Sequence, residues 1–233
     1  MEEAIRDCNM QNPNIRSGGS DKDGDGGAGA MTALSHALSW IFSPVLTPTY
    51  GLLAVFAFTP LRYASSQALW TVSLIVFGLT GLLPGLAVFL MTKYGDVSDI
   101  ELSRRRDRLF PYLIMGVALA AAGVYIQAVG MPLWCARFYW GAAVACGVNL
   151  LINFRWKISA HGAGMGGLTA LFVLLTRYSL TMAHFWISVP IMLTLTGLLC
   201  MGRVWLGRHT PLQTVAGSLA GFLSVFLFAT INL

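Results

Sequence analysis

The chain alternates long apolar runs with short polar stretches. The apolar runs cover about residues 37–58, 68–92, 109–130, 133–153, 160–177, 182–202 and 211–231. Each run is close to the ~20 residues that a helix needs to cross the hydrocarbon core of a bilayer. The pattern therefore predicts an all-α, polytopic transmembrane helix bundle of six to seven spans. The number stays open because Pro44 and Pro48 interrupt the first run, which can instead be re-entrant or interfacial.

The N-terminal residues 1–31 differ from the rest of the chain because they are polar and rich in glycine. Such a composition predicts a disordered tail, followed by a single membrane domain at 32–233. The run from Asp21 to Gly26 has the spacing that opens a calcium-binding loop. Thr32 stands at the twelfth position, where that loop needs a glutamate, so we expect no metal there.

Composition supports a membrane location. Hydrophobic residues make up 56% of the chain and charged residues only 11%, whereas soluble domains carry about a quarter charged residues. We expect an integral membrane protein, in the inner membrane of a bacterium. The net charge of +5 comes from cations in short loops, which contact membrane lipids and set orientation, so no nucleic-acid partner is implied. Cations that bind an anion also raise the number of loop cations, so this number does not decide the orientation. The sequence does not indicate the oligomeric state.

Small residues recur at four-residue spacing, first at Gly162 and Gly166 and again at Gly217 and Gly221. Such pairs allow two helix backbones to approach closely within a membrane. We therefore expect the helices that carry them to form the tightly packed centre of the bundle.

Two polar stretches carry the candidate chemistry, residues 157–161 (Lys-Ile-Ser-Ala-His) and 203–209 (Arg-Val-Trp-Leu-Gly-Arg-His). The first opens one apolar helix and the second closes the next, so both lie at the same membrane face. Ionisable side chains at membrane depth are costly, and they mark functional sites. Pro211 is suited to begin a helix whose amides point toward His209. A helix N-terminus with arginine and lysine binds phosphate. One neutral imidazole can attack phosphorus while a second, protonated one donates a proton to the leaving oxygen.

These residues resemble motifs of the type-2 phosphatidic acid phosphatase family, which is related to vanadium haloperoxidases. The family pattern Ser-Arg-x5-His-x3-Asp corresponds to residues 202–213. The pattern Pro-Ser-Gly-His corresponds to residues 158–161, where Ile158 and Ala160 replace the proline and the glycine. The resemblance implies that His209 is the nucleophile and His161 the general acid. It also implies that Arg203 and Ser159 hold phosphate oxygens, and that Gln213 stands where an aspartate orients the nucleophile.

The chain departs from the family at several positions. Gly202 replaces a serine, and the first motif, Lys-x6-Arg-Pro, has no clean match. As the phosphate-binding cation of this first motif we favour Lys157 and then Arg155. The arginine run 104–108 is the alternative. Gln213 can still accept a proton from the imidazole and fix its tautomer, but it cannot stabilise an imidazolium as an aspartate does.

The resemblance implies a phosphatase that hydrolyses a phosphomonoester or diphosphate of a lipid, with no metal and no cofactor. The candidate substrates are phosphatidate-like lipids, polyprenyl phosphates and phosphorylated glycolipids. One alternative is a lipid-binding pseudo-phosphatase, which the glutamine and the missing first motif favour. Another is a prenyltransferase-like enzyme that uses Asp96, Asp99 and Glu101 to hold a magnesium diphosphate. We expect packing or interfacial roles for His36 and His184, and helix-to-helix hydrogen bonds from the asparagines at 149 and 153.

Overall fold

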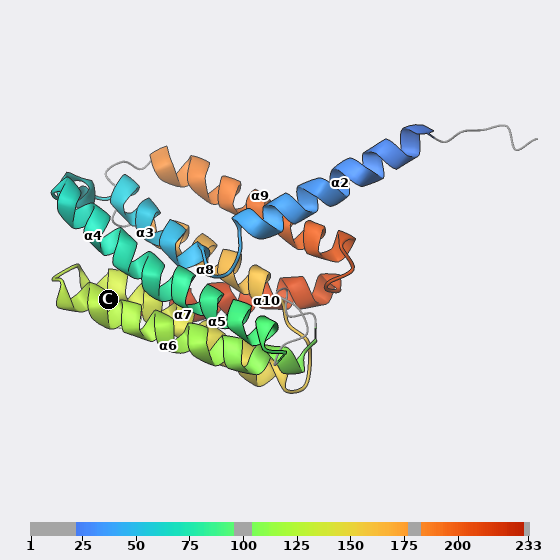
Figure 1. The fold of residues 1–233 in the computed structure, drawn as a ribbon. Coiled ribbons are helices and arrows are strands. Elements are labelled where there is room, and N and C mark those ends of the chain that lie inside the picture. Colours follow the sequence, from blue (N-terminus) through green and yellow to red (C-terminus); the bar gives the residue numbers. More distant parts are fainter. Residues whose placement is uncertain (1–21, 96–103, 177–182, 231–233) are drawn as a thin grey trace, which may run out of the picture. The chain divides into compact units, whose positions relative to one another are not determined.

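The computed structural model describes residues 22–95, 104–176 and 183–230, and every regular element within them is helical. The longer helices are α2 (Lys22–Ile41), α3 (Thr47–Phe58), α4 (Ser66–Phe77), α5 (Leu83–Lys93), α6 (Leu109–Ala128), α7 (Leu133–Asn153), α8 (Ala160–Leu175), α9 (Ala183–Trp205) and α10 (Pro211–Thr230), joined in part by short helical turns at η2 (Pro60–Tyr63), η3 (Gly78–Leu82) and η4 (Arg106–Arg108) (Figure 1). The chain divides into two compact units, Met1–Met31 and Thr32–Leu233. The second unit contains all of the candidate site residues.

Five helical segments of the described residues are long and apolar enough to cross a membrane, and they are compatible with an integral membrane protein. They are Ser66–Lys93, Arg106–Ala128, Leu133–Asn153, Trp186–Trp205 and Pro211–Thr230. The first combines α4, η3 and α5, with a π-helical turn at Gly78–Leu82. The predicted all-helical class is confirmed. The apolar runs at 37–58 and 160–177 give shorter helices, α3 with 12 residues and α8 with 16.

The apolar run 37–58 does not form one helix. Helix α2 ends at Ile41 and α3 begins at Thr47, with Pro44 between them and Pro48 in the first turn of α3. Proline lacks the N–H that a continuous helix would use, so it fits only the start of the second helix. The N-terminal boundary also differs from expectation, because the structure describes residues 22–31 as the first part of α2. The disorder expected for residues 1–21 falls outside the described residues.

The contact between α8 and α10 is the closest in the bundle core, as the glycine spacing predicted. A Cβ atom added at Gly162 would lie 2.7 Å from the carbonyl oxygen of Thr214. At Gly166 it would overlap the carbonyl of Ser218, and at Gly221 that of Ala163. Only glycine allows the two backbones to lie this close. The result is a fixed spacing between the two helices whose first turns carry the candidate site.

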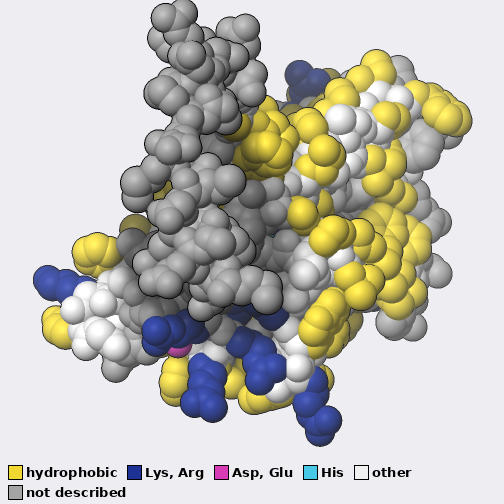
Figure 2. All heavy atoms as spheres, turned by 90° about the vertical axis from the view of Figure 1, so that its right-hand side faces the viewer, with side chains coloured by type: hydrophobic (Ala, Val, Ile, Leu, Met, Phe, Trp, Pro, Cys, Tyr) yellow, Lys and Arg dark blue, Asp and Glu magenta, His cyan; other side chains and the backbone are white. Residues whose placement is uncertain are grey.

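From α5 onward successive helices run in opposite directions, so the first turns of α6, α8 and α10 meet the last turns of α7 and α9 at one end of the bundle (Figure 1). Hydrogen bonds connect these turns. Arg105 Nη1 donates to the carbonyl of Arg155 at 2.8 Å, and Lys157 Nζ donates to the carbonyl of Arg208 at 2.8 Å. Figure 2 shows Lys and Arg side chains gathered along the lower edge of the molecule, next to a surface rich in hydrophobic side chains. The polar stretches therefore lie at the same end, as the sequence predicted.

Candidate active site

The turn between α9 and α10 places His209 against Arg203. Gly207 has a φ of +65°, a left-handed conformation that glycine adopts without strain. The N–H of Gly207 donates to the carbonyl of Val204 at 2.9 Å, and the N–H of Arg208 donates to that of Arg203 at 3.1 Å. This is the Schellman arrangement that ends many helices. The chain then reverses, and the N–H of His209 also donates to the Arg203 carbonyl at 3.3 Å.

Gln213 holds His209 and caps α10 at the same time. Its Oε1 accepts a hydrogen bond from the N–H of Thr210 at 3.2 Å, while the N–H of Gln213 lies 3.4 Å from Thr210 Oγ1. These two bonds form a capping box. The same Oε1 lies 3.1 Å from His209 Nδ1. Because that oxygen can only accept, Nδ1 carries the proton and Nε2 keeps its lone pair. Gln213 thereby fixes the tautomer in which Nε2 can act as a nucleophile.

The connection between α7 and α8 packs directly against the start of α10. The N–H of Ser159 donates to the carbonyl of Gln213 at 3.2 Å. The Ser159 side chain is fully buried, and its Oγ accepts the N–H of Gly162 at 3.1 Å. Ser159 is therefore the N-cap of α8. Its hydroxyl contributes to the site by fixing the first turn that carries His161.

His161 lies in the first turn of α8 and contacts α2. Its Nε2 is 3.1 Å from the carbonyl oxygen of Ser39. Since a carbonyl only accepts, Nε2–H is the donor and Nδ1 is the free nitrogen of the neutral ring. The carbonyl orients the imidazole toward α2, so the segment of α2 that follows residue 31 is part of the site.

Arg108 places a cation in the site. The sequence indicated the arginine run 104–108 as an alternative source of this cation but did not single out Arg108. It directly precedes α6, it is 5% exposed, and its Nη1 donates to the carbonyl of Ile158 at 2.7 Å. This bond ties the start of α6 to the residue before Ser159. The guanidinium also lines the central cavity together with Arg203, His161 and His209. The two arginines are therefore cations of the same cavity as the two imidazoles.

The electrostatic surroundings of His209 favour its neutral form. Its pKa is lowered to about 3, first by burial, then by the positive charge of Arg108, and to a smaller extent by Lys157 and Arg203. The hydrogen bond with Gln213 acts in the opposite direction. At neutral pH the imidazole is therefore uncharged, as a nucleophile must be. The excess of positive charge around it favours binding of an anion.

The cavity that these residues line has a volume of about 370 Å³ and a polar end and an apolar end. The polar end holds the two arginines and two histidines. The rest of the lining is mainly apolar and includes Val45, Pro48, Val88, Met115, Leu119, Phe138, Ala142, Leu168 and Val225. On α6 the lining runs from Arg108 to Leu119, about 16 Å at 1.5 Å per residue. This is about half of the ~30 Å hydrocarbon core, or one leaflet.

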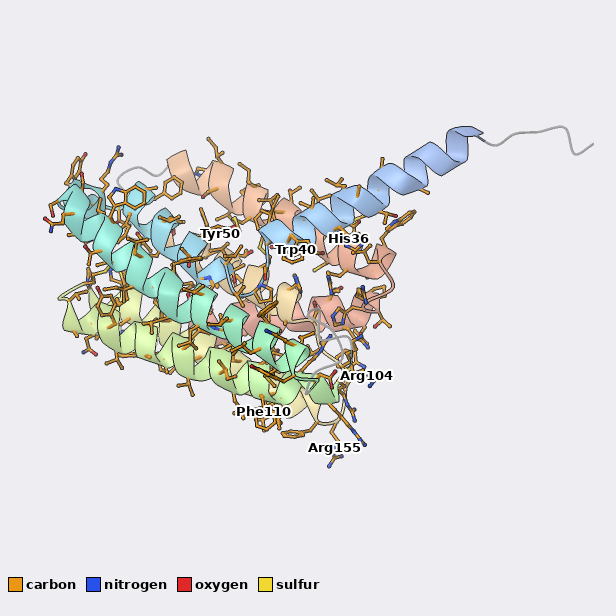
Figure 3. The ribbon with its side chains drawn as sticks, viewed as in Figure 1. His36, Trp40, Tyr50, Arg104, Phe110 and Arg155 are labelled. Atoms are coloured by element: carbon orange, nitrogen blue, oxygen red, sulfur yellow. The ribbon has the colours of Figure 1, made fainter. Side chains whose placement is uncertain are left out.

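Some of the predicted site residues line the cavity or hold a residue that lines it, and others lie outside it. His209, His161 and Arg203 line the cavity, and Gln213 holds His209. Lys157 is half-buried and bonded to the Arg208 carbonyl, close enough to influence the pKa of His209. Arg155, which we favoured next for the first-motif role, has an exposed side chain and is not among the residues that line the cavity; Figure 3 shows it at the lower edge of the molecule. The alternative, the arginine run, is the one that contributes a cation to the cavity.

Two further outcomes concern α2. His36, for which we expected only packing or interfacial contact, lines the cavity, as does the neighbouring Trp40 (Figure 3). No spacing in the sequence connects them to the motifs. Gly202, which stands where the family has serine, faces Ser35. A Cβ atom there would lie 3.3 Å from Ser35 Cβ and Oγ. The glycine thus makes room for α2.

Some sequence predictions fall outside the described parts of the chain. These concern the acidic residues at 96–101, the side chain of His184 and the calcium-like run near residue 21. A scan against protein-family models and searches of curated proteins and of solved structures found no match to this chain.

Proposed function

We propose that the protein is a metal-independent phosphatase that removes the phosphate from a membrane lipid, through a phosphohistidine at His209. The observation that carries this proposal is the pairing of His209 with Gln213, 3.1 Å apart, in a cavity that also holds His161 and two buried arginines. A neutral imidazole of fixed tautomer beside fixed cations is suited to attack a phosphate that the cations bind.

The proposed reaction uses both imidazoles that line the cavity. Arg203 and Arg108 bind the phosphoryl oxygens, and His209 Nε2 attacks phosphorus. As the N–P bond forms, the bond from phosphorus to the lipid oxygen breaks. A protonated His161 donates to that oxygen, which leaves as the lipid alcohol. Water then attacks phosphorus and passes a proton to His161 while the N–P bond to His209 breaks, which releases inorganic phosphate and restores the neutral His209. The negative charge of the bound phosphate favours the protonated form of His161.

The amphipathic cavity supports a lipid as the substrate. Its polar end fits a phosphate group and its apolar part fits hydrocarbon, which buries favourably against Phe138, Leu168 and their neighbours. We further propose that α3 and α8 are membrane segments together with the five longer ones, which gives seven. Their lengths are about 18 and 24 Å at 1.5 Å per residue, shorter than the hydrocarbon core, and both helices are apolar and largely buried against the longer ones. On the resemblance of the two motifs we also propose membership of the type-2 phosphatidic acid phosphatase family, and we propose residence in a bacterial inner membrane.

One observation favours the second candidate, a lipid-binding protein without turnover. Gln213 is uncharged, so it stabilises the phosphorylated imidazolium less than an aspartate would. This candidate predicts the same binding site but no release of phosphate.

The test measures phosphate release from a panel of lipid phosphates in detergent with EDTA present. Wild-type protein should release phosphate, and His209→Ala and His161→Ala should not. Ile187→Ala is a matched control, because Ile187 is 64% exposed on the surface of α9; it should keep wild-type activity. Release that survives His209→Ala would refute the proposed nucleophile. Binding without release would favour the second candidate, and release only with magnesium would refute a metal-independent reaction.

A further inference from the structure

The cavity contains a buried amide that the protein leaves partly unpaired. Asn149 lies on α7, it is 2% exposed, and it lines the cavity. Its Oδ1 accepts no hydrogen bond within the described part of the chain. A buried polar atom without a partner is unfavourable, and native proteins retain few of them. The amide is therefore a candidate for contact with a bound molecule.

The next turn of α7 provides a comparison. Asn153 is similarly buried, but its Nδ2 donates to the carbonyl of Arg105 at 2.9 Å. That bond joins α7 to the segment before α6, which is the helix-to-helix role expected from the sequence. Although Oδ1 of Asn153 also lacks a partner among the described residues, Asn153 is not among those that line the cavity. Of the two asparagines, Asn149 is the one that a ligand in the cavity can reach.

A second polar group lies beside Asn149 in the same lining. The hydroxyl of Tyr112, on α6, is buried in the same lining, beside the guanidinium of Arg108. It lies close enough to Arg108 and Cys146 to interact with both electrostatically, and Cys146 is one turn before Asn149 on α7. The amide and the phenol thus form a polar section next to the cation that we propose binds phosphate. Beyond it, the lining on both helices becomes apolar with Met115 and Ala142.

From this arrangement we infer that the site selects lipid phosphates that carry a hydroxyl or an amide close to the phosphate ester, and that Asn149 binds this group, with Tyr112 beside it. The inference rests on the proposed function, since it assumes that the phosphate lies between the two arginines. A substrate that continues directly into hydrocarbon, such as a polyprenyl phosphate, would bury the amide and the phenol against methylene groups. Sites built to hydrogen-bond a substrate discriminate strongly against analogues that lack the bonding group.

The test compares two single-chain substrates of equal chain length, an alkyl monophosphate and a 1-acylglycerol 3-phosphate with its free hydroxyl. Phosphate release by wild type should show a kcat/KM at least about tenfold higher for the hydroxyl-bearing lipid. Asn149→Leu, which keeps the volume, should reduce this ratio to about one by slowing only that lipid. Asn149→Ala provides a smaller replacement, and Leu151→Ala, at a position 69% exposed on the same helix, is the control.

Binding of both lipids to His209→Ala protein, with and without Asn149→Leu, separates this inference from the proposed function. A preference for the hydroxyl-bearing lipid that Asn149→Leu abolishes supports the inference even if no variant releases phosphate, in which case the phosphatase proposal fails alone. Equal handling of both lipids by wild type, or an equal loss for both in Asn149→Leu, would overturn the inference while the phosphatase proposal stands.

Discussion

Gln213 offers the sharpest test of how the site works, because one side-chain oxygen bonds both the proposed nucleophile, His209, and the first turn of α10. Replacement by leucine keeps the approximate size and removes the oxygen. It deletes the bond to His209 Nδ1 at 3.1 Å and the bond from the Thr210 N–H at 3.2 Å. Thr210 is exposed, so water replaces the second bond and the loss of the cap costs about 1 kcal/mol of stability.

The larger effect should be on catalysis. A hydrogen bond to a group that becomes charged contributes about 1.5–3 kcal/mol, and here it also keeps the proton on Nδ1. At 1.36 kcal/mol per tenfold change, Gln213→Leu should lower kcat by roughly 10- to 100-fold. Gln213→Glu keeps an oxygen that can accept both hydrogen bonds, so the rate should hold or rise. The added negative charge should raise the pKa of His209 from about 3 and move the acidic limb of the kcat/KM profile to higher pH.

The assay is phosphate release in detergent across pH 4–9, with thermal unfolding measured in parallel. Equal activity of Gln213→Leu and wild type would refute the role assigned to the glutamine. Loss of activity in Gln213→Glu, with the protein folded, would refute the view that an acceptor at this position is sufficient.

Burial, charge and close packing give three further predictions. Arg108→Ala should lower kcat/KM by about 100-fold or more, because it removes one cationic donor from the cavity. The matched change Arg155→Ala, at an exposed arginine, should keep kcat/KM within about twofold of wild type. Equal effects of the two changes in the release assay would contradict the assignment of Arg108. The pKa of His209 is about 3 in the folded protein and about 6.5 in the unfolded chain, so the contribution of His209 to stability should be complete above pH 6.5 and decline as the pH falls toward 3. The unfolding temperature of wild type should therefore fall more steeply over this pH range than that of His209→Gln. Equal slopes in the two proteins would argue against the lowered pKa. Gly166→Leu should prevent folding or separate α8 from α10, because even a Cβ atom overlaps the Ser218 carbonyl, while Gly147→Ala, whose added methyl meets nothing within 4 Å, should keep the wild-type unfolding temperature.

Periodicity and length were sufficient to predict the helical class, and the glycine spacing predicted the close contact of α8 and α10. The placement of His161 and His209 at one end followed from the alternation of helix direction alone. These features depend on local sequence and on the alternation of helix direction, so a single sequence is enough to predict them.

Arg108 and the contribution of α2 could not be predicted in the same way. Four arginines lie between residues 104 and 108, and the sequence does not distinguish the buried one from the exposed ones. The contact of Ser39 with His161 joins residues 122 positions apart. From the sequence, Gly202 could be described only as lacking the hydroxyl of the serine in the family motif. Its reason, the approach of Ser35, is a tertiary contact that no spacing records.

The most direct test of the central claim is detection of the covalent intermediate. Wild-type protein is mixed with a lipid phosphate that it hydrolyses, quenched under alkaline conditions that preserve phosphohistidine, digested, and analysed by mass spectrometry. The account predicts a phosphoryl group on His209, formed and lost at rates compatible with turnover and absent from His209→Ala. Turnover without any phosphorylated residue, or with the phosphoryl group on a different side chain, would contradict it.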